Sequence, residues 1–161
     1  MKHAAKPKQV VGTEPSEASS RAVLAPAGRI LVVDDDPAAR VLASRVFSGA
    51  GFEVATAQSG FECLEKIRKG PNAFDLIVLD LSMPFMDGEE TFRHLRAINP
   101  DAVVILSTGF LTQAQDRIDR MVAAGLAGSI RKPHRPDEIL AQVFATLEQV
   151  KMSRVGAAGV N

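Results

Sequence analysis

The sequence has a single cysteine and neither tryptophan nor tyrosine among its 161 residues, and its formal charges cancel. Cys63 alone cannot form an internal disulfide or a cysteine-based metal cluster, so nothing requires an oxidising compartment. No apolar run approaches the roughly eighteen residues of a membrane span, and the polar first twenty residues contain no signal-peptide core. These absences favour a cytoplasmic protein without a membrane partner.

A basic face is also missing. Residues 1–28 carry a net charge of +2 and residues 151–161 another +2, which leaves −4 on the segment between them. A mildly acidic core gives no reason to expect nucleic-acid binding, which requires clustered positive charge. The lack of Trp and Tyr also removes the side chains most often used to stack on bases.

Length and composition favour one globular domain. Hydrophobic residues make up 46% of the chain and charged residues 24%, as in ordinary folded proteins. Residues 1–28 are rich in Ala, Pro, Ser, Lys and Glu without apolar periodicity, which predicts a flexible leader. We expect the folded domain to cover residues 29–150 and a short tail to follow at 151–161.

Short apolar runs alternate with helical patterns along this domain. Such alternation predicts an α/β fold, a parallel sheet with helices on both faces. We expect strands at 30–33, 52–57, 74–80, 103–107 and 128–131, and helices at 37–49, 60–69, 89–99, 111–124 and 136–151. The expected inward-facing helix residues are Ala39, Leu42, Val46, Phe47, Phe61, Leu64, Ile67, Phe92, Leu95, Ile98, Ile118, Val122, Ile139, Leu140, Val143, Phe144 and Leu147.

Every strand except the second is followed by polar residues that chemistry could use. In a parallel sheet the carboxyl ends of the strands share one edge, where open α/β sheets bind ligands. Several carboxylates in one crevice repel each other unless a cation offsets them, and Mg²⁺ prefers such oxygen ligands. The residues at these strand ends are Asp34, Asp35 and Asp36, then Asp80, then Ser107 and Thr108, then Lys132.

The most informative stretch runs from residue 75 to residue 88. Its apolar residues 76–79 end at Asp80, and the Met-Pro-Phe-Met-Asp-Gly sequence of residues 83–88 follows. This stretch resembles the phosphorylation segment of response-regulator receiver domains in two-component systems. Residues 107–110 and 125–128 look most like receivers of hybrid sensor histidine kinases. The resemblance implies a flavodoxin-like, doubly wound fold of five strands in the order 2-1-3-4-5 with five helices.

The resemblance also implies roles for individual residues. Asp80 would be the phosphoacceptor, with Thr108 and Lys132 binding phosphoryl oxygens. Mg²⁺ would be held by Asp35, Asp80 and the Ser82 backbone carbonyl, with Asp34 acting through water. Lys132-Pro133 matches a peptide bond that is cis in the family.

The implied function is that of a phospho-accepting receiver. A histidine kinase or histidine phosphotransfer protein would supply the phosphoryl group, and the chain would catalyse only its own phosphorylation and dephosphorylation. With only ten residues after Lys151, we expect no output domain, so signalling would occur by protein contact. The expected contact face lies within residues 111–150, on the fourth helix, fifth strand and fifth helix, in a monomer or weak homodimer.

Other polar residues have simpler interpretations. Asp36 precedes Pro37 and is expected to cap the first helix. Asp87 with Gly88 is interpreted as a turn, and Cys63 as a small buried hydrophobe. His94 and His134 have no partner at metal-ligand spacing, so both are expected to be surface residues.

One position departs from the family pattern. Receivers place an aromatic switch residue three positions before the lysine, and Ser129 stands there. Phe110 could instead report phosphorylation or shield the acyl phosphate. A receiver fold kept as a non-phosphorylated interaction module is therefore one alternative. A haloacid-dehalogenase-like phosphatase is another, but its motif wants Thr or Val where Ala38 stands.

Overall fold

The computed structural model describes residues 25–159, and the expected leader therefore lies almost wholly outside the described residues. Five parallel strands form one sheet in the order β2-β1-β3-β4-β5. The strands are β1 (Arg29–Val33), β2 (Glu53–Ala57), β3 (Leu76–Asp80), β4 (Val104–Thr108) and β5 (Gly128–Arg131). The predicted fold class and strand order are both confirmed.

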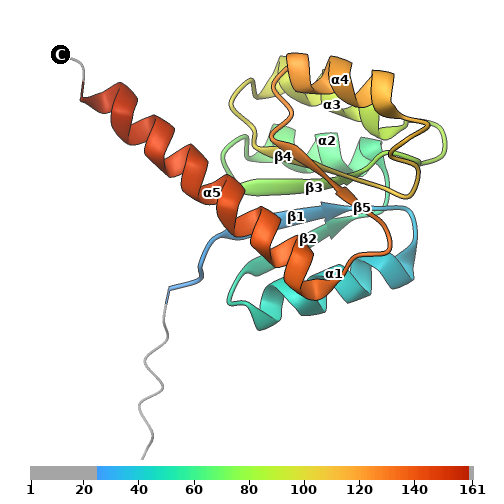
Figure 1. Ribbon diagram of the computed structural model, residues 1–161, viewed down its shortest axis with the longest axis horizontal. Coiled ribbons are helices and arrows are strands. Elements are labelled where there is room, and N and C mark those ends of the chain that lie inside the picture. Colours follow the sequence, from blue (N-terminus) through green and yellow to red (C-terminus); the bar gives the residue numbers. More distant parts are fainter. Residues whose placement is uncertain (1–24, 160–161) are drawn as a thin grey trace, which may run out of the picture.

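Five helices cover the two faces of the sheet (Figure 1). Helices α1 and α5 lie on one face, and α2, α3 and α4 lie on the other. Their bounds are α1 (Pro37–Gly49), α2 (Gly60–Lys69), α3 (Gly88–Ile98), α4 (Gln115–Ala123) and α5 (Pro136–Ala158). None of the helices in the part of the chain that the structure describes combines the length and apolarity needed to cross a bilayer.

Strand burial explains why the strands were readable from sequence. All five residues of β3 are buried, and so are all five of β4, because helices cover both sides of these central strands. The core is divided by the sheet into two apolar clusters, one under α1 and α5 and one under α2, α3 and α4. Cys63 is fully buried in the second cluster, as predicted.

Four helix residues expected in the core are instead exposed. Leu42, Phe61, Val122 and Phe144 expose 54%, 58%, 53% and 44% of their surface. In each of these helices, fewer apolar residues pack against the core than the apolar pattern in the sequence predicts. In α1, for example, Ala43 and Phe47 are the buried residues, which turns Leu42 outward.

Two helix boundaries also differ from the prediction. Residues 111–114 form turns, so α4 begins at Gln115, four residues later than predicted. Helix α5 continues past Lys151 to Ala158, and its last turns project beyond the sheet (Figure 1). The apolar pattern in the sequence ends before the helix does. The last turns of α5 do not bury a face, and their apolar residues Met152 and Val155 are exposed.

A group of ion pairs, the α3–α4 cluster, joins α4 to the start of α3. Arg117 donates to Asp87 Oδ2 at 2.6 Å and to Glu89 Oε2 at 2.7 Å. Arg120 pairs with Glu89 at 3.0 Å. The cluster therefore consists of two acids and two arginines.

Candidate phosphoacceptor and metal site

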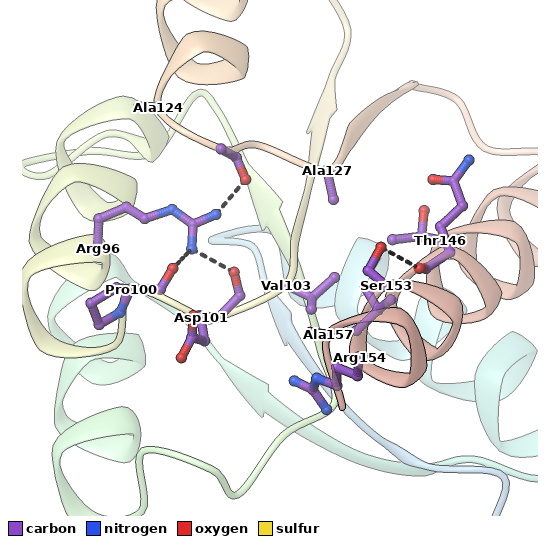
Figure 2. A pocket seen from close by; sticks show the side chains of 14 residues that line it. Arg96, Pro100, Asp101, Val103, Ala124, Ala127, Thr146, Ser153, Arg154 and Ala157 are labelled. Atoms are coloured by element: carbon purple, nitrogen blue, oxygen red, sulfur yellow. Dashed lines mark hydrogen bonds between the residues drawn. The ribbon is translucent and has the colours of Figure 1, made fainter. Parts of the chain in front are cut away.

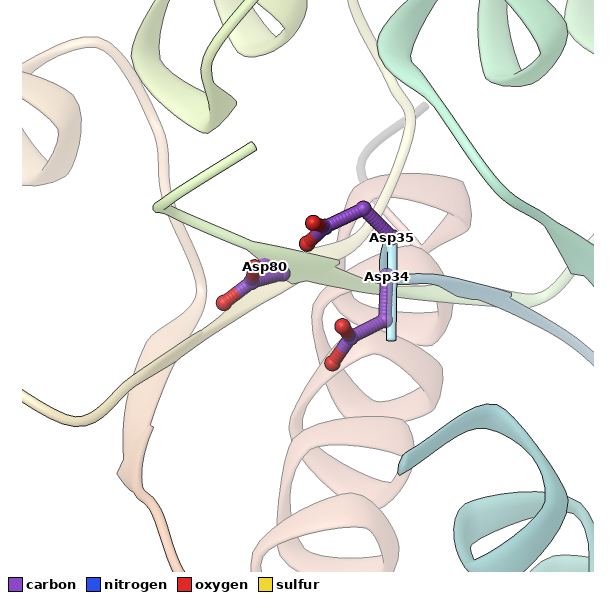
Figure 3. Close-up of side chains that lie close together, drawn as sticks. All are labelled: Asp34, Asp35 and Asp80. Carbon is purple, nitrogen blue, oxygen red and sulfur yellow. The ribbon is translucent and has the colours of Figure 1, made fainter. Parts of the chain in front are cut away.

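The three aspartates at the ends of β1 and β3 come together at the carboxyl edge of the sheet. Asp34 and Asp35 follow β1, and Asp80 ends the neighbouring strand β3. One carboxylate oxygen from each lies within 4.8 Å of the others. Figure 3 shows the three side chains projecting to the same side of the two strands.

Lys132 completes this group, which we call the acid edge (Asp34, Asp35, Asp80 and Lys132). Its Nζ lies 2.6 Å from Asp34 Oδ2 and 3.0 Å from Asp80 Oδ1. Lys132 follows β5, and its backbone N–H donates to the Thr108 carbonyl at 2.9 Å. Two of the three carboxylates thus share one ammonium group.

Burial and pairing shift the ionisation of the two central groups. Burial raises the pKa of Asp80, although its bonds to Lys132 act in the opposite direction. Burial lowers the pKa of Lys132, but its ion pairs with Asp34 and Asp80 outweigh burial and raise it overall. Lys132 is therefore held in its charged form beside a carboxylate that is costly to ionise.

The loops after β1 and β3 are shaped by local hydrogen bonds. Asp36 accepts a bond from Ala38 N at 2.9 Å and caps α1, as predicted. Asp87 caps α3 by accepting from Glu90 N at 2.9 Å. At Gly88 any Cβ would collide with the backbone of Asp80, so only glycine lets α3 begin this close to the end of β3.

The remaining predicted site residues lie nearby but differ in exposure. Thr108 ends β4 and is fully buried, and its Oγ1 accepts a bond from Phe110 N at 3.2 Å. Ser82 is exposed in the loop after β3. The Lys132–Pro133 peptide bond is cis, as the resemblance implied.

The donor set of the acid edge fits a hard divalent cation. All three clustered ligand atoms are carboxylate oxygens, which suit Mg²⁺ better than soft transition metals. Lys132 offsets only part of their negative charge. The group could therefore hold a metal ion.

The family model of the response regulator receiver domain matches residues 30–144. The chain belongs to this family. Response regulator MprA from Mycobacterium sp. (strain KMS) is 39% identical over 124 residues, covering 75% of this chain and 51% of the relative. MprA from Mycobacterium ulcerans (strain Agy99) is 38% identical over 133 residues, covering 81% of this chain and 54% of the relative. The chain thus spans about half the length of these relatives.

Solved receiver structures share the fold. A receiver domain protein from Clostridium thermocellum superposes with a TM-score of 0.71 at 26% identity, covering 77% of this chain and 97% of that one. A CheY-like receiver from Methanospirillum hungatei JF-1 gives a TM-score of 0.71 at 28% identity, with coverage of 78% and 97%. This protein is a receiver domain of two-component signalling.

His134, expected at the surface, is only partly exposed and makes two hydrogen bonds. In this receiver domain its Nε2 lies 2.9 Å from Ser107 Oγ, and its Nδ1 lies 3.2 Å from the Arg131 carbonyl. Burial lowers its pKa. Its position two residues after Lys132, beside the predicted edge, was the only signal available in the sequence.

Arg40 was also missed, because its role depends on three-dimensional contacts. From the first turns of α1, its Nη1 donates to the carbonyls of Asp34 and Asp35. The sequence places Arg40 on a helix but gives no sign that it turns back onto the preceding loop.

Two cavities lie away from the carboxylates. One, of about 360 Å³, adjoins Lys132 between α1 and the β5–α5 loop. The other, of about 610 Å³, lies beneath α5 at the opposite edge of the sheet (Figure 2). There Arg96 donates to the carbonyls of Pro100, Ala102 and Gly125, so its guanidinium serves to join loops.

Proposed function

We propose that the receiver takes a phosphoryl group from a phosphohistidine onto Asp80 and signals by protein contact. The observation that carries this proposal is the acid edge, where three carboxylates cluster and Lys132 pairs with two of them. A purely structural set of buried charges would be balanced, because unpaired buried charge is costly. A bound divalent cation would offset the surplus negative charge and would also bind the incoming phosphoryl group, which is itself negatively charged.

In the proposed reaction, the Asp80 carboxylate attacks the phosphorus atom of the donor. A phosphorus–oxygen bond forms, the phosphorus–nitrogen bond breaks, and the imidazole leaves as the neutral base after gaining a proton from solvent. Lys132 is already 3.0 Å from Asp80 and would pair with a phosphoryl oxygen. The donor is a histidine kinase or a histidine phosphotransfer protein.

Mg²⁺ is the proposed cofactor of the acid edge. Asp35, Asp80 and the Ser82 carbonyl would hold it directly, and Asp34 would act through water. When bound, Mg²⁺ offsets negative charge on the transferred phosphoryl group. Lys132 already donates a hydrogen bond to Asp34 Oδ2, which agrees with a role for Asp34 in which it would bind the metal through water.

Thr108 and Phe110 form the proposed readout in place of an aromatic residue at position 129. Thr108 Oγ1 accepts a bond from Phe110 N, so a hydroxyl that turns toward a phosphoryl oxygen would release this bond. Phe110 is 61% exposed, so a change in the orientation of its ring would alter the surface that a partner meets. Phe110→Ser should shorten the acyl-phosphate lifetime if the ring shields the site, and an unchanged lifetime would remove that idea.

Two surfaces are proposed for protein partners. The 360 Å³ apolar cavity includes the exposed Leu42 and is lined by Lys132, which lies 3.0 Å from Asp80, so a donor protein docked there would border the phosphoacceptor. A downstream target would use the face of α4, β5 and α5. Leu42→Glu should slow transfer from a phosphorylated histidine phosphotransfer protein and leave phosphorylation by acetyl phosphate unchanged. Equal effects on both donors would contradict the docking role of Leu42.

The test of the function is phosphorylation by a small donor. Incubation with acetyl phosphate and Mg²⁺ should add the mass of one phosphoryl group to the intact protein, and Asp80→Asn should abolish the addition. No mass shift in the wild type would favour the interaction module suggested by Ser129. Steady turnover of small phosphate esters would instead favour a phosphatase.

A further inference from the structure

Arg40 makes an unusual contact with the loop that carries two acids of the acid edge. One nitrogen, Nη1, donates to the carbonyl of Asp34 at 2.6 Å and to the carbonyl of Asp35 at 3.1 Å. The side chain is partly buried. A single guanidinium thus fixes two consecutive peptide groups between β1 and α1.

The rest of this loop is held at other points. Asp34 N donates to the Ala57 carbonyl of β2 at 3.1 Å, and Asp36 N donates to Asp34 Oδ1 at 3.0 Å. These bonds fix amide groups, whereas Arg40 supplies the donor for the carbonyls. Rotation of the Asp34 and Asp35 peptide planes would swing both carboxylates away from Asp80.

The location of Arg40 is unfavourable for a residue without such a role. It is the fourth residue of α1, near the positive end of the helix dipole, where a cation is disfavoured. The first turn itself contains no acidic residue, and the carboxylate of the N-cap residue Asp36 accepts a bond from Ala38 N, not from Arg40. Its hydrogen bonds to the loop are the compensation visible in the structure.

Arg40 also differs from Lys132 because it leaves the carboxylate oxygens of the acid edge free. Lys132 bonds directly to carboxylate oxygens of Asp34 and Asp80, which a cation would also seek. Arg40 bonds only to main-chain oxygens of the acid pair, so it orders their loop without occupying their carboxylates. It can therefore support a bound cation without competing for its ligands.

We propose that Arg40 is a positioning residue for the divalent cation site. It holds the Asp34–Asp35 backbone so that the Asp35 carboxylate faces Asp80. The inference rests on the proposed Mg²⁺ site and adds a specific residue to it. Outer residues that orient metal ligands typically change metal affinity by about 10- to 100-fold when replaced.

The experiment is a calorimetric titration of the full chain with MgCl₂ at pH 7, without any phosphodonor. Arg40→Met keeps the aliphatic length and removes both hydrogen bonds, and should weaken Mg²⁺ binding by about tenfold or more. Arg40→Lys restores a single donor and should fall between Met and the wild type. Arg45→Met is the matched control, because Arg45 is an exposed residue of the same helix, and its affinity should stay within about twofold of the wild type.

The outcomes separate this inference from the proposed function. Wild-type binding that is lost in Asp35→Asn but unchanged in Arg40→Met would overturn the role of Arg40 and leave the metal site standing. A wild type that binds no Mg²⁺ would overturn both. Urea unfolding in EDTA identifies a variant that fails to fold, and if Arg40→Met does so, Arg40→Ala decides the question, because alanine favours the helix and also removes both hydrogen bonds. An Arg40→Ala affinity equal to that of the wild type would overturn the inference.

Discussion

The acid edge and the α3–α4 cluster are both groups of close ion pairs, but their charge balance differs. In the acid edge one ammonium faces three carboxylates, two of which belong to buried residues. In the α3–α4 cluster two arginines face two acids, and the arginine and acid side chains all remain partly exposed. The balanced cluster has what a structural contact between helices requires, whereas the acid edge carries a surplus of negative charge that a divalent cation would offset.

The difference teaches where to look for chemistry among ion pairs. Exposed pairs contribute little and tolerate replacement, since water screens them. Buried pairs carry a large desolvation cost, so a surplus of one sign persists only where another ion or substrate uses it. Distances alone do not separate the two groups, because Arg117–Asp87 and Lys132–Asp34 are both 2.6 Å.

The largest effect on stability is expected at Lys132. Lys132→Met removes the only ammonium of the acid edge and should lower the free energy of unfolding in EDTA by about 2 kcal/mol, reduced from the value for a fully buried pair because Lys132 is partly exposed. Millimolar Mg²⁺ should restore part of the loss, as measured by urea unfolding. If Lys132→Met were as stable as the wild type in EDTA, the carboxylates of the acid edge would need no positive charge beside them for stability.

A smaller effect is expected in the loop that connects the two clusters. Phe85 has a φ of +68° and is 97% exposed, so its side chain offers little to offset the left-handed backbone. Phe85→Asn should raise the free energy of unfolding by about 0.5 to 1 kcal/mol, because Asn adopts this conformation more readily. Thermal unfolding measures the gain, and a clear loss of stability would show that Phe85 packs in a way the exposure does not reveal.

The α3–α4 cluster should contribute less than the acid edge. A double-mutant cycle with Arg117→Met and Glu89→Gln should give a coupling energy of about 0.5 kcal/mol, and added NaCl should reduce it. A coupling as large as the effect at Lys132 would remove the distinction between the two clusters.

The smallest effect concerns the pH dependence of Glu89. The hydrogen bond from Arg117 holds the pKa of Glu89 below its usual range. Its contribution to stability is therefore complete above the unfolded-state pKa of about 4.3 and is lost as pH falls through the lower folded-state pKa. Unfolding measured below about pH 4.5 should depend less on pH in Glu89→Gln than in the wild type, and identical slopes would contradict the assignment.

Much of the fold could be predicted because burial leaves a direct trace in the sequence. Strand β3 is apolar throughout and covered on both faces, so its existence and its end at Asp80 were readable. Exposed helix residues were harder: the pattern of α2 does not distinguish Phe61 from Leu64, although only Leu64 is buried. Which part of an apolar stripe is covered depends on how the neighbouring helices pack.

The sequence predicted which residues form the site better than it predicted the hydrogen bonds that hold the site together. Parallel topology brings Asp34, Asp35, Asp80 and Lys132 to one edge, and the structure has all four there. Arg40 and His134 were not predicted, because each acts through a three-dimensional contact that the sequence does not specify: Arg40 bonds to the β1–α1 loop, and His134 bonds to Ser107 of β4. Polar residues one turn inside a helix or two residues past a strand end therefore need a structure to be interpreted.

The most direct test of the central claim, that surplus negative charge at the acid edge forms a cation site, is the melting temperature with and without Mg²⁺. Calorimetry should show that millimolar MgCl₂ raises the Tm of the wild type above that in NaCl of equal ionic strength, because a ligand of the folded state stabilises it. Asp35→Asn should lose most of this increase. An equal Mg²⁺-dependent increase in Asp35→Asn, or none in the wild type, would contradict the account.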